Sequence, residues 1–129
     1  MTRQVYRPQN ATSDSPYSPV VRLNNTLYVS GHVPVDPQTR QVVGHDIAAQ
    51  TRLTLENLKA SLALAGASLA DVVKTTVFLT DIADFAEMNK AYRAFFPKDP
   101  PARTTIGVAA LSNPAMRVEI ELIAAAPKA

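Results

Sequence analysis

The 129-residue sequence has no cysteine, which excludes a disulfide scaffold, a cysteine zinc site, an iron–sulfur cluster and a cysteine nucleophile. Its four glycines form neither a GxGxxG nor a GxxxxGK[ST] pattern, so no phosphate-binding loop and no cofactor are expected. No apolar stretch approaches the roughly 20 residues that span a bilayer, and the first residues lack a signal-peptide core. We therefore expect a cytoplasmic protein with no membrane partner.

The chain also lacks a strong excess of either charge. Thirteen Lys and Arg residues stand against eleven Asp and Glu, the net charge is +2, and the basic residues occur singly. This pattern does not indicate a nucleic-acid partner. The size and the 47% hydrophobic content predict one domain over residues 1–129, large enough to bury a single core.

Histidine is scarce as well, and neither residue has a metal-ligand spacing. His32 and His45 lie thirteen positions apart in one predicted loop and form no HExxH motif. We expect neither a metal site nor a paired acid–base role for them. Serine triads are equally unsupported, because no nucleophile-elbow pattern surrounds Ser30.

The N-terminal third reads as loop, hairpin and loop. Three prolines and several turn-forming residues predict a loop over residues 1–19. Two β-rich segments, 20–23 and 27–30, flank an asparagine pair and predict a hairpin whose second strand ends at Gly31. An irregular loop with two prolines and a glycine follows.

The spacing then becomes helical between Asp46, a suitable N-cap, and Gly66, a suitable C-terminal glycine. The predicted helix covers residues 46–65 and places six residues on one apolar stripe: Ile47, Thr51, Leu55, Leu58, Leu62 and Ala65.

The rest of the chain alternates strands with one more helix. Residues 72–80 have period two and predict a central strand with Val73, Thr75, Val77 and Leu79 on one face. A second helix follows the caps at 81–84 and ends before Pro97, with Phe85, Met88, Tyr92 and Phe95 as its apolar positions. Two further strands are predicted over residues 103–108 and 116–125.

This order of elements predicts an α+β fold in which two helices cover one face of a mixed sheet. The other face then remains open. In the last strand, Val118, Ile120 and Leu122 are expected to face the helices. The open face is expected to carry the alternate positions: Arg117, Glu119, Glu121 and Ile123.

Two strands carry candidates for chemistry. Arg103, at the mouth of a strand after two prolines and an alanine, is suited to gripping a carboxylate bidentately, although an ordinary exposed arginine fits as well. Glu119 and Glu121 share a strand face with Arg117, which suits either catalysis or a solvated or subunit-contacting face.

Six short segments occur in a characteristic order: Ser15-Pro16-Tyr17, Tyr28-Val29-Ser30-Gly31 with Pro34, Val73-Lys74-Thr75-Thr76-Val77-Phe78-Leu79, Met88-Asn89, Pro101-Ala102-Arg103 and Val118-Glu119-Ile120-Glu121. Together they resemble the Rid family of reactive-intermediate deaminases, also called YjgF or RidA proteins. The resemblance extends from about residue 17 to residue 125. It implies a chorismate-mutase-like α+β fold, a homotrimer, and ligand clefts between neighbouring subunits.

The resemblance also implies an activity: hydrolysis of enamines or imines such as 2-aminoacrylate and 2-iminobutanoate to 2-keto acids and ammonia, without a metal or organic cofactor. Arg103 would bind the substrate carboxylate. Glu119 would hold and activate the attacking water, with help from the Gly31 carbonyl. The remaining substrate-binding positions would be Tyr17, Ser30, Asn89 and Thr105, and Lys74 would flank the entrance.

One departure bears on substrate choice. Many family members have a small residue and then cysteine after the arginine, where this chain has Thr104-Thr105. The threonine hydroxyl can still donate to a carboxylate, so catalysis should survive. Three alternatives stay open: a non-catalytic trimer that binds small 2-keto acids or amino acids, a deaminase with a dedicated substrate such as 2-aminomuconate, and, last, the ribonuclease activity attached to some relatives.

Overall fold

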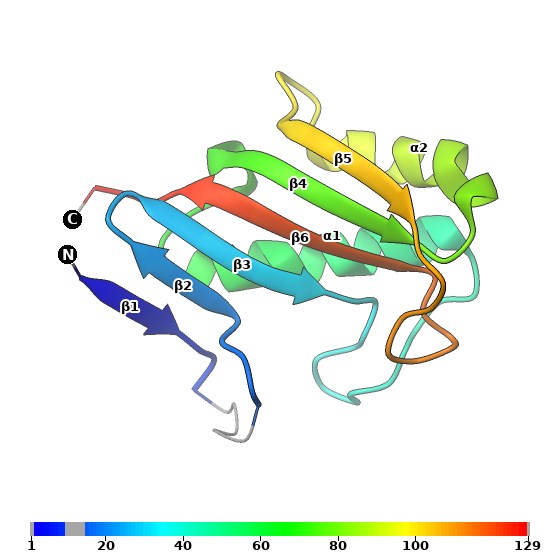
Figure 1. The fold of residues 1–129 in the computed structure, drawn as a ribbon, viewed down its shortest axis with the longest axis horizontal. Coiled ribbons are helices and arrows are strands. Elements are labelled where there is room, and N and C mark those ends of the chain that lie inside the picture. Colours follow the sequence, from blue (N-terminus) through cyan, green and yellow to red (C-terminus); the bar gives the residue numbers. More distant parts are fainter. Residues whose placement is uncertain (1, 10–14, 129) are drawn as a thin grey trace.

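The computed structural model describes residues 2–9 and 15–128, which build one six-stranded sheet in the order β1-β2-β3-β6-β4-β5 (Figure 1). Strands β4 and β5 are parallel, and every other neighbouring pair is antiparallel. The strands are β1 (Arg3–Tyr6), β2 (Val20–Leu23), β3 (Thr26–His32), β4 (Val72–Leu79), β5 (Ala102–Gly107) and β6 (Val118–Ala125).

Two helices, α1 (Ile47–Leu64) and α2 (Phe85–Phe95), lie together behind the sheet in Figure 1. Short 3₁₀ helices, η1 (Leu69–Asp71) and η2 (Ile82–Asp84), precede β4 and α2. The predicted α+β arrangement, with both helices on one face of a mixed sheet, is therefore confirmed. The opposite face is not covered by any described helix.

The ends of α1 follow the predicted capping chemistry. Asp46 accepts a hydrogen bond from the Ala49 amide at 2.7 Å, which satisfies one of the free N–H groups of the first turn. Gly66 follows the C-terminal end with φ = 76°, a conformation that favours glycine. All six residues of the predicted apolar stripe are buried.

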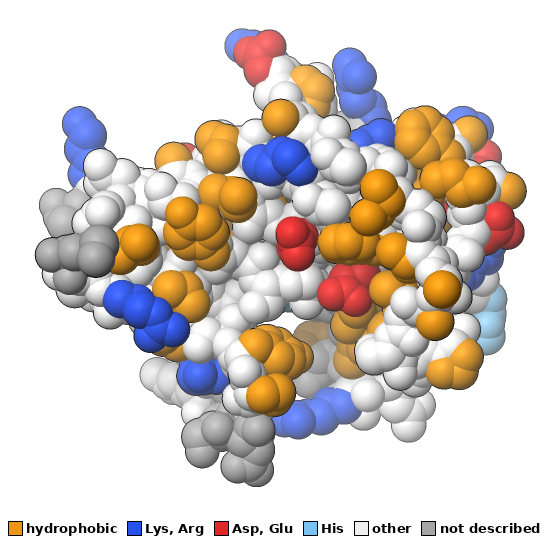
Figure 2. All heavy atoms as spheres, in the orientation of Figure 1, with side chains coloured by type: hydrophobic (Ala, Val, Ile, Leu, Met, Phe, Trp, Pro, Cys, Tyr) orange, Lys and Arg blue, Asp and Glu red, His pale blue; other side chains and the backbone are white. Residues whose placement is uncertain are grey.

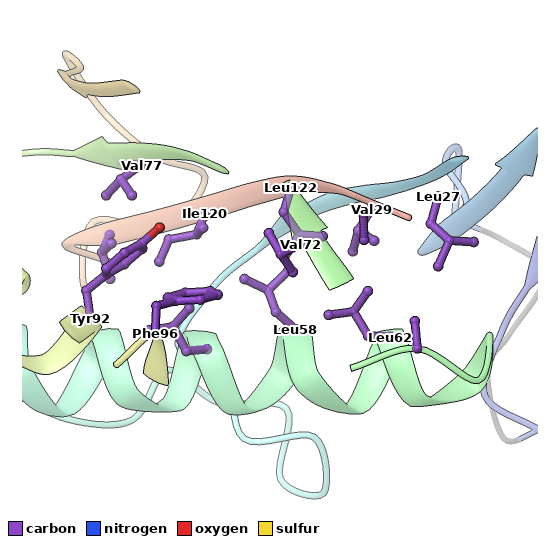
Figure 3. Close-up of a cluster of buried hydrophobic side chains, with 14 of the residues drawn as sticks. Leu27, Val29, Leu58, Leu62, Val72, Val77, Tyr92, Phe96, Ile120 and Leu122 are labelled. Carbon is purple, nitrogen blue, oxygen red and sulfur yellow. The ribbon is translucent and has the colours of Figure 1, made fainter. Parts of the chain in front are cut away.

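The core fills the space between α1, α2 and the inner face of the sheet (Figure 3). Side chains from β3, β4 and β6 point toward the helices and meet the apolar stripe of α1 and the aromatic residues of α2. Labelled members of this cluster are Leu27, Val29, Leu58, Leu62, Val72, Val77, Tyr92, Phe96, Ile120 and Leu122.

The prediction of a loop over residues 1–19 is wrong for its first part. Residues 3–6 form the edge strand β1, antiparallel to β2, with Val5 opposite Val21. The segment is largely polar, so its pairing depends on backbone hydrogen bonds to β2 rather than on a buried face. Residues 10–14 of the predicted loop lie outside the described part of the chain.

Two bulges account for the remaining differences. Strand β3 does not end at Gly31, because it continues through a bulge to His32. A register shift in β4 falls between Val72 and Lys74, so Val72 occupies the inward position. Val73, which was expected to share a face with Thr75, Val77 and Leu79, is 55% exposed, whereas those three residues are buried. Simple alternation does not anticipate an inserted residue. The second helix and the last two strands match their predicted bounds within two residues.

Candidate functional site

Arg103 reaches from β5 to the helix side of the sheet, where it lies over two aromatic rings of α2. Its guanidinium carbon is 4.8 Å from the centroid of Tyr92 and 5.6 Å from that of Phe85. The nearest polar contact is the Met88 sulfur, 4.0 Å from Nη1. Among the described residues, no carboxylate forms an ion pair with Arg103. The charged fork is therefore held in place by stacking while its donors remain available for an anion.

Two buried oxygen atoms near Arg103 lack a hydrogen-bond partner among the described residues: Asn89 Oδ1 and Thr105 Oγ1. Thr105 is two residues after Arg103 in β5 and shares its face. Asn89, with Arg103, also lines a cavity of about 510 Å³ at the end of α2. Buried polar atoms are normally satisfied, so these two oxygen atoms need a partner that the described residues do not supply. We call Arg103, Asn89 and Thr105 the arginine half-site.

Tyr92 packs its ring against the guanidinium of the arginine half-site. Its hydroxyl and Thr75 Oγ1 are 2.7 Å apart in a buried hydrogen bond, which fixes the ring beneath the guanidinium. Burial raises the pKa of Tyr92, although the Thr75 bond and the Arg103 charge oppose that rise. The sequence assigned Tyr92 and Phe85 to helix packing. Their contact with the Arg103 guanidinium depends on β5 lying beside α2, and local sequence patterns do not predict that packing.

Glu119 lies on the opposite face of the sheet. Its neighbours Val118 and Ile120 are fully buried toward the helices, so the carboxylate points to the open face. Oε2 occupies the space beside Gly31, where a Cβ would overlap it. Burial raises the pKa of Glu119, and the like charge of Glu121 raises it further. The Glu119 carboxylate is therefore partly desolvated and packs against the backbone of Gly31, which has no side chain.

Tyr17 and Ser30 belong to the surroundings of Gly31. Tyr17 is 60% exposed and lines, with Gly31, a cavity of about 420 Å³ whose other walls are mainly apolar. The Ser30 hydroxyl donates to the Ser18 carbonyl at 2.6 Å, and the Ser30 amide donates to Pro19 at 3.0 Å. Ser30 thus anchors the segment that carries Tyr17. We call Glu119, Gly31, Ser30 and Tyr17 the glutamate half-site.

Figure 2 views the open face, with acidic groups near its centre and a hollow beside them. The arginine half-site lies on the helix side of the same sheet. Arg103 and Glu119 therefore lie on opposite faces of the sheet and do not meet within one chain. The roles of these residues stay predictions.

The expected grouping of Arg117 with Glu119 and Glu121 is wrong. Arg117 forms a two-pronged ion pair with the nearly buried Asp84, at 2.7 and 3.2 Å, and donates to the His45 carbonyl at 2.9 Å. It lies just before β6, where the chain is free to turn toward the helix side. Arg117 therefore ties the start of β6 to the loops before α1 and α2.

Lys74 lies on the open face, where its ammonium donates to the Thr75 carbonyl and to the hydroxyls of Thr76 and Thr104 at 2.9–3.4 Å. Within residues 2–9 and 15–128, no three metal-ligating side chains gather. None of the helices described is long and apolar enough to cross a membrane.

Known proteins resemble this chain in sequence and in fold. The profile of the family described as Endoribonuclease L-PSP matches residues 8–126. The 2-iminobutanoate/2-iminopropanoate deaminase of Escherichia coli K12 is 40% identical over 127 residues, covering 96% of this chain and 98% of that protein. Two solved structures are also similar. Yersinia pestis YyfA, described as a conserved Rid family protein, has a TM-score of 0.88, 39% identity and coverages of 96% and 99%. Escherichia coli TdcF with bound serine has a TM-score of 0.87, 38% identity and the same coverages. The chain belongs to the Rid family, also known as the YjgF family.

Proposed function

We propose that this protein is an enamine and imine deaminase that converts 2-aminoacrylate, 2-iminobutanoate or similar intermediates to 2-keto acids and ammonia. The observation that carries the proposal is Arg103, a stacked guanidinium without a carboxylate partner among the described residues. The identity to a 2-iminobutanoate/2-iminopropanoate deaminase and the serine bound to TdcF support the same kind of ligand, a small amino-acid-like carboxylate.

The arginine half-site would bind and orient the substrate. Arg103 would hold the carboxylate through paired N–H donors, a contact contributing roughly 1.5–3 kcal/mol. Thr105 Oγ1 and Asn89 Oδ1 lack protein partners and would complete the polar cradle, the hydroxyl donating to the carboxylate and the amide oxygen accepting from the imine nitrogen. This fixes the reacting carbon relative to the water.

The glutamate half-site would supply the nucleophile. Glu119 would take a proton from a water that the Gly31 carbonyl helps to orient, and the water oxygen would form a bond to the imine carbon. Glu119 returns that proton to the imine nitrogen to give the tetrahedral adduct. Transfer of the adduct's hydroxyl proton to the same nitrogen then lets the carbon–nitrogen bond break as the hydroxyl oxygen becomes the ketone oxygen. One water is consumed, and the products are a 2-keto acid and ammonia. The raised pKa of Glu119 suits this exchange, since such a carboxylate both accepts and returns a proton readily.

A site that uses both groups needs two copies of the chain, because they lie on opposite faces of one sheet. We propose that the assembly is the homotrimer that the family resemblance implies, with Arg103 of one subunit facing Glu119 of the next. The uncovered sheet face, with Tyr28, Val73 and Ile106 each more than 40% exposed, supports burial against other copies.

The test couples the purified protein to a pyridoxal-phosphate dehydratase that generates the imine, with semicarbazide to trap whatever survives. The wild type should lower trapping and raise keto-acid release, whereas Arg103→Ala should do neither. Arg52→Ala is the matched control, because it removes an exposed arginine of α1 that does not line the cavity beside Arg103. Turnover by Arg103→Ala at the wild-type rate contradicts the proposal. Ligand binding without turnover by the wild type would instead favour a binding protein.

A mixing experiment tests the shared site. Arg103→Ala and Glu119→Gln subunits are each expected to be inactive alone. After unfolding and refolding together in equal amounts, about one quarter of the sites should combine an intact Arg103 with an intact Glu119, if assembly is random. Recovery of roughly that fraction of activity supports a site built by two subunits, and no recovery contradicts it.

A further inference from the structure

His32 forms a polar bridge that the proposed mechanism does not use. Its Nδ1 lies 2.7 Å from the Ser30 carbonyl oxygen, and its Nε2 lies 2.7 Å from Ser61 Oγ of α1. A carbonyl oxygen only accepts, so Nδ1 carries the proton, and Nε2 accepts from the Ser61 hydroxyl. Burial lowers the pKa of His32, against the opposing effect of the Ser30 bond, which favours this neutral form. The imidazole thus connects β3 to the last turn of α1.

The bridge spans the bulge in β3. Val29 pairs with Leu122 and His32 with Ile120, so two residues of β3, Ser30 and Gly31, face the single residue between those partners in β6. His32 is in register with the inward-facing Ile120, which directs its ring to α1. The extra residue therefore leaves Gly31 directly against Glu119 on the other face.

A bulge leaves one residue without regular ladder bonds, so its conformation depends on other contacts. Two such contacts hold this bulge. Ser30 is held on one side by Ser18 and Pro19, and His32 is held on the other by Ser61, which is only 8% exposed. The His32 bridge is the contact that ties the bulge to the rigid interior.

We propose that His32 is a positioning residue for the deaminase reaction: by joining the Ser30 carbonyl to Ser61 of α1, it fixes the β3 bulge and so sets where Gly31 and Glu119 hold the attacking water. The inference rests on the proposed function, since it assigns His32 a part in the same site. In this proposal His32 acts through Gly31 and Glu119 and not by contacting the substrate. Its effect is on the step that needs the oriented water, whereas carboxylate binding depends on Arg103 in the other half-site.

The test compares His32→Leu, Ser61→Ala and His32→Gln in steady-state imine hydrolysis. His32→Leu removes both bridge bonds, and kcat should fall about 10- to 100-fold while KM changes little, because a shift of about 1 Å in a reacting group can have an effect of this size. Ser61→Ala, which keeps the ring, should fall less. His32→Gln should recover part of kcat, since an amide can replace one bond.

Thr54→Val is the matched control. It removes a fully buried hydroxyl from the same helix, and that hydroxyl has no partner among the described residues. Its kcat should equal that of the wild type. If His32→Leu fails to fold, Ser61→Ala carries the comparison. A kcat within twofold of wild type in folded Ser61→Ala and His32→Leu overturns the proposal.

A second measurement separates this proposal from the deaminase assignment. Titration of the Glu119 carboxyl carbon by NMR needs no turnover. Loosening the bulge should admit water to the carboxylate, so the pKa of Glu119 should fall toward its ordinary value in His32→Leu and stay raised in Thr54→Val. An unchanged titration in His32→Leu overturns the positioning role even if the wild type is inactive on every imine. Inactivity of the wild type together with the expected titration overturns only the deaminase assignment.

Discussion

Replacement of Gly31 by alanine should separate function from stability in this protein. A Cβ at this position would overlap Glu119 Oε2 and lie 3.0 Å from Cδ and 3.2 Å from Cγ of the same side chain. Gly31 has no left-handed φ, so alanine introduces no backbone strain. The neighbour that has to move is the end of a flexible side chain, and the fold can accommodate that movement.

The size of the effect follows from these contacts. Ordinary contacts to a methyl carbon lie at about 3.5–4.0 Å, so the overlapping Oε2 has to retreat by more than about 1 Å, further than Cδ or Cγ. A displacement of about 1 Å at a reacting group can lower kcat by about 100-fold. The free energy of unfolding should stay within about 1 kcal/mol of wild type, because alanine also restricts the unfolded chain.

Gly107→Ala is the control for this prediction. A Cβ at Gly107 meets only Ile82 Cβ at 3.8 Å and the Leu79 carbonyl at 3.9 Å, which are ordinary contacts. Urea unfolding and the semicarbazide assay should be run on both variants. Wild-type kcat in folded Gly31→Ala would refute the reasoning that the Gly31 contact sets the position of Glu119.

Three further predictions follow from individual side chains. The raised pKa of Glu119 should place the acid limb of the kcat–pH profile above the ordinary carboxyl range, since only the ionised carboxylate accepts a proton. Glu121→Gln should move that limb to lower pH, because it removes the like charge; burial of Glu119 should keep part of the pKa rise. In urea unfolding, Thr54→Val should raise the free energy of unfolding by about 1 kcal/mol, because it removes a buried hydroxyl without a partner among the described residues. Arg117→Ala should lower the same quantity by roughly 1.5–3 kcal/mol, because Asp84, only 11% exposed, loses its charged partner.

A specific result would contradict each of these three predictions. An acid limb that is unmoved in Glu121→Gln would show that the two carboxylates do not interact. A destabilised Thr54→Val would show that its hydroxyl has a partner after all. Wild-type stability of Arg117→Ala would show that Asp84 is adequately hydrated without Arg117. Lys90→Ala is the control for loss of an exposed cation, and its free energy of unfolding should change by less than about 1 kcal/mol.

Much of the fold was predictable because its signals are local. The caps at Asp46 and Gly66 and the stripe between them define α1 without reference to any other element. The alternation of Val118, Ile120 and Leu122 correctly predicted the inward face of β6. Val73 and the extension of β3 past Gly31 were not predictable in this way, because a bulge arises from the pairing of two strands distant in sequence.

The sequence by itself determined the α+β class, the helix bounds, the faces of β6 and the ordered motifs that identify the family, since each depends on residue types at short, fixed spacings. Only the tertiary structure decided that Arg103 stacks on Tyr92, that Arg117 pairs with Asp84, and that His32 reaches Ser61. Only it separated Arg103 from Glu119 on opposite faces of the sheet. These contacts join residues from different elements, and their geometry is set by strand order and helix packing, which short-range patterns do not encode.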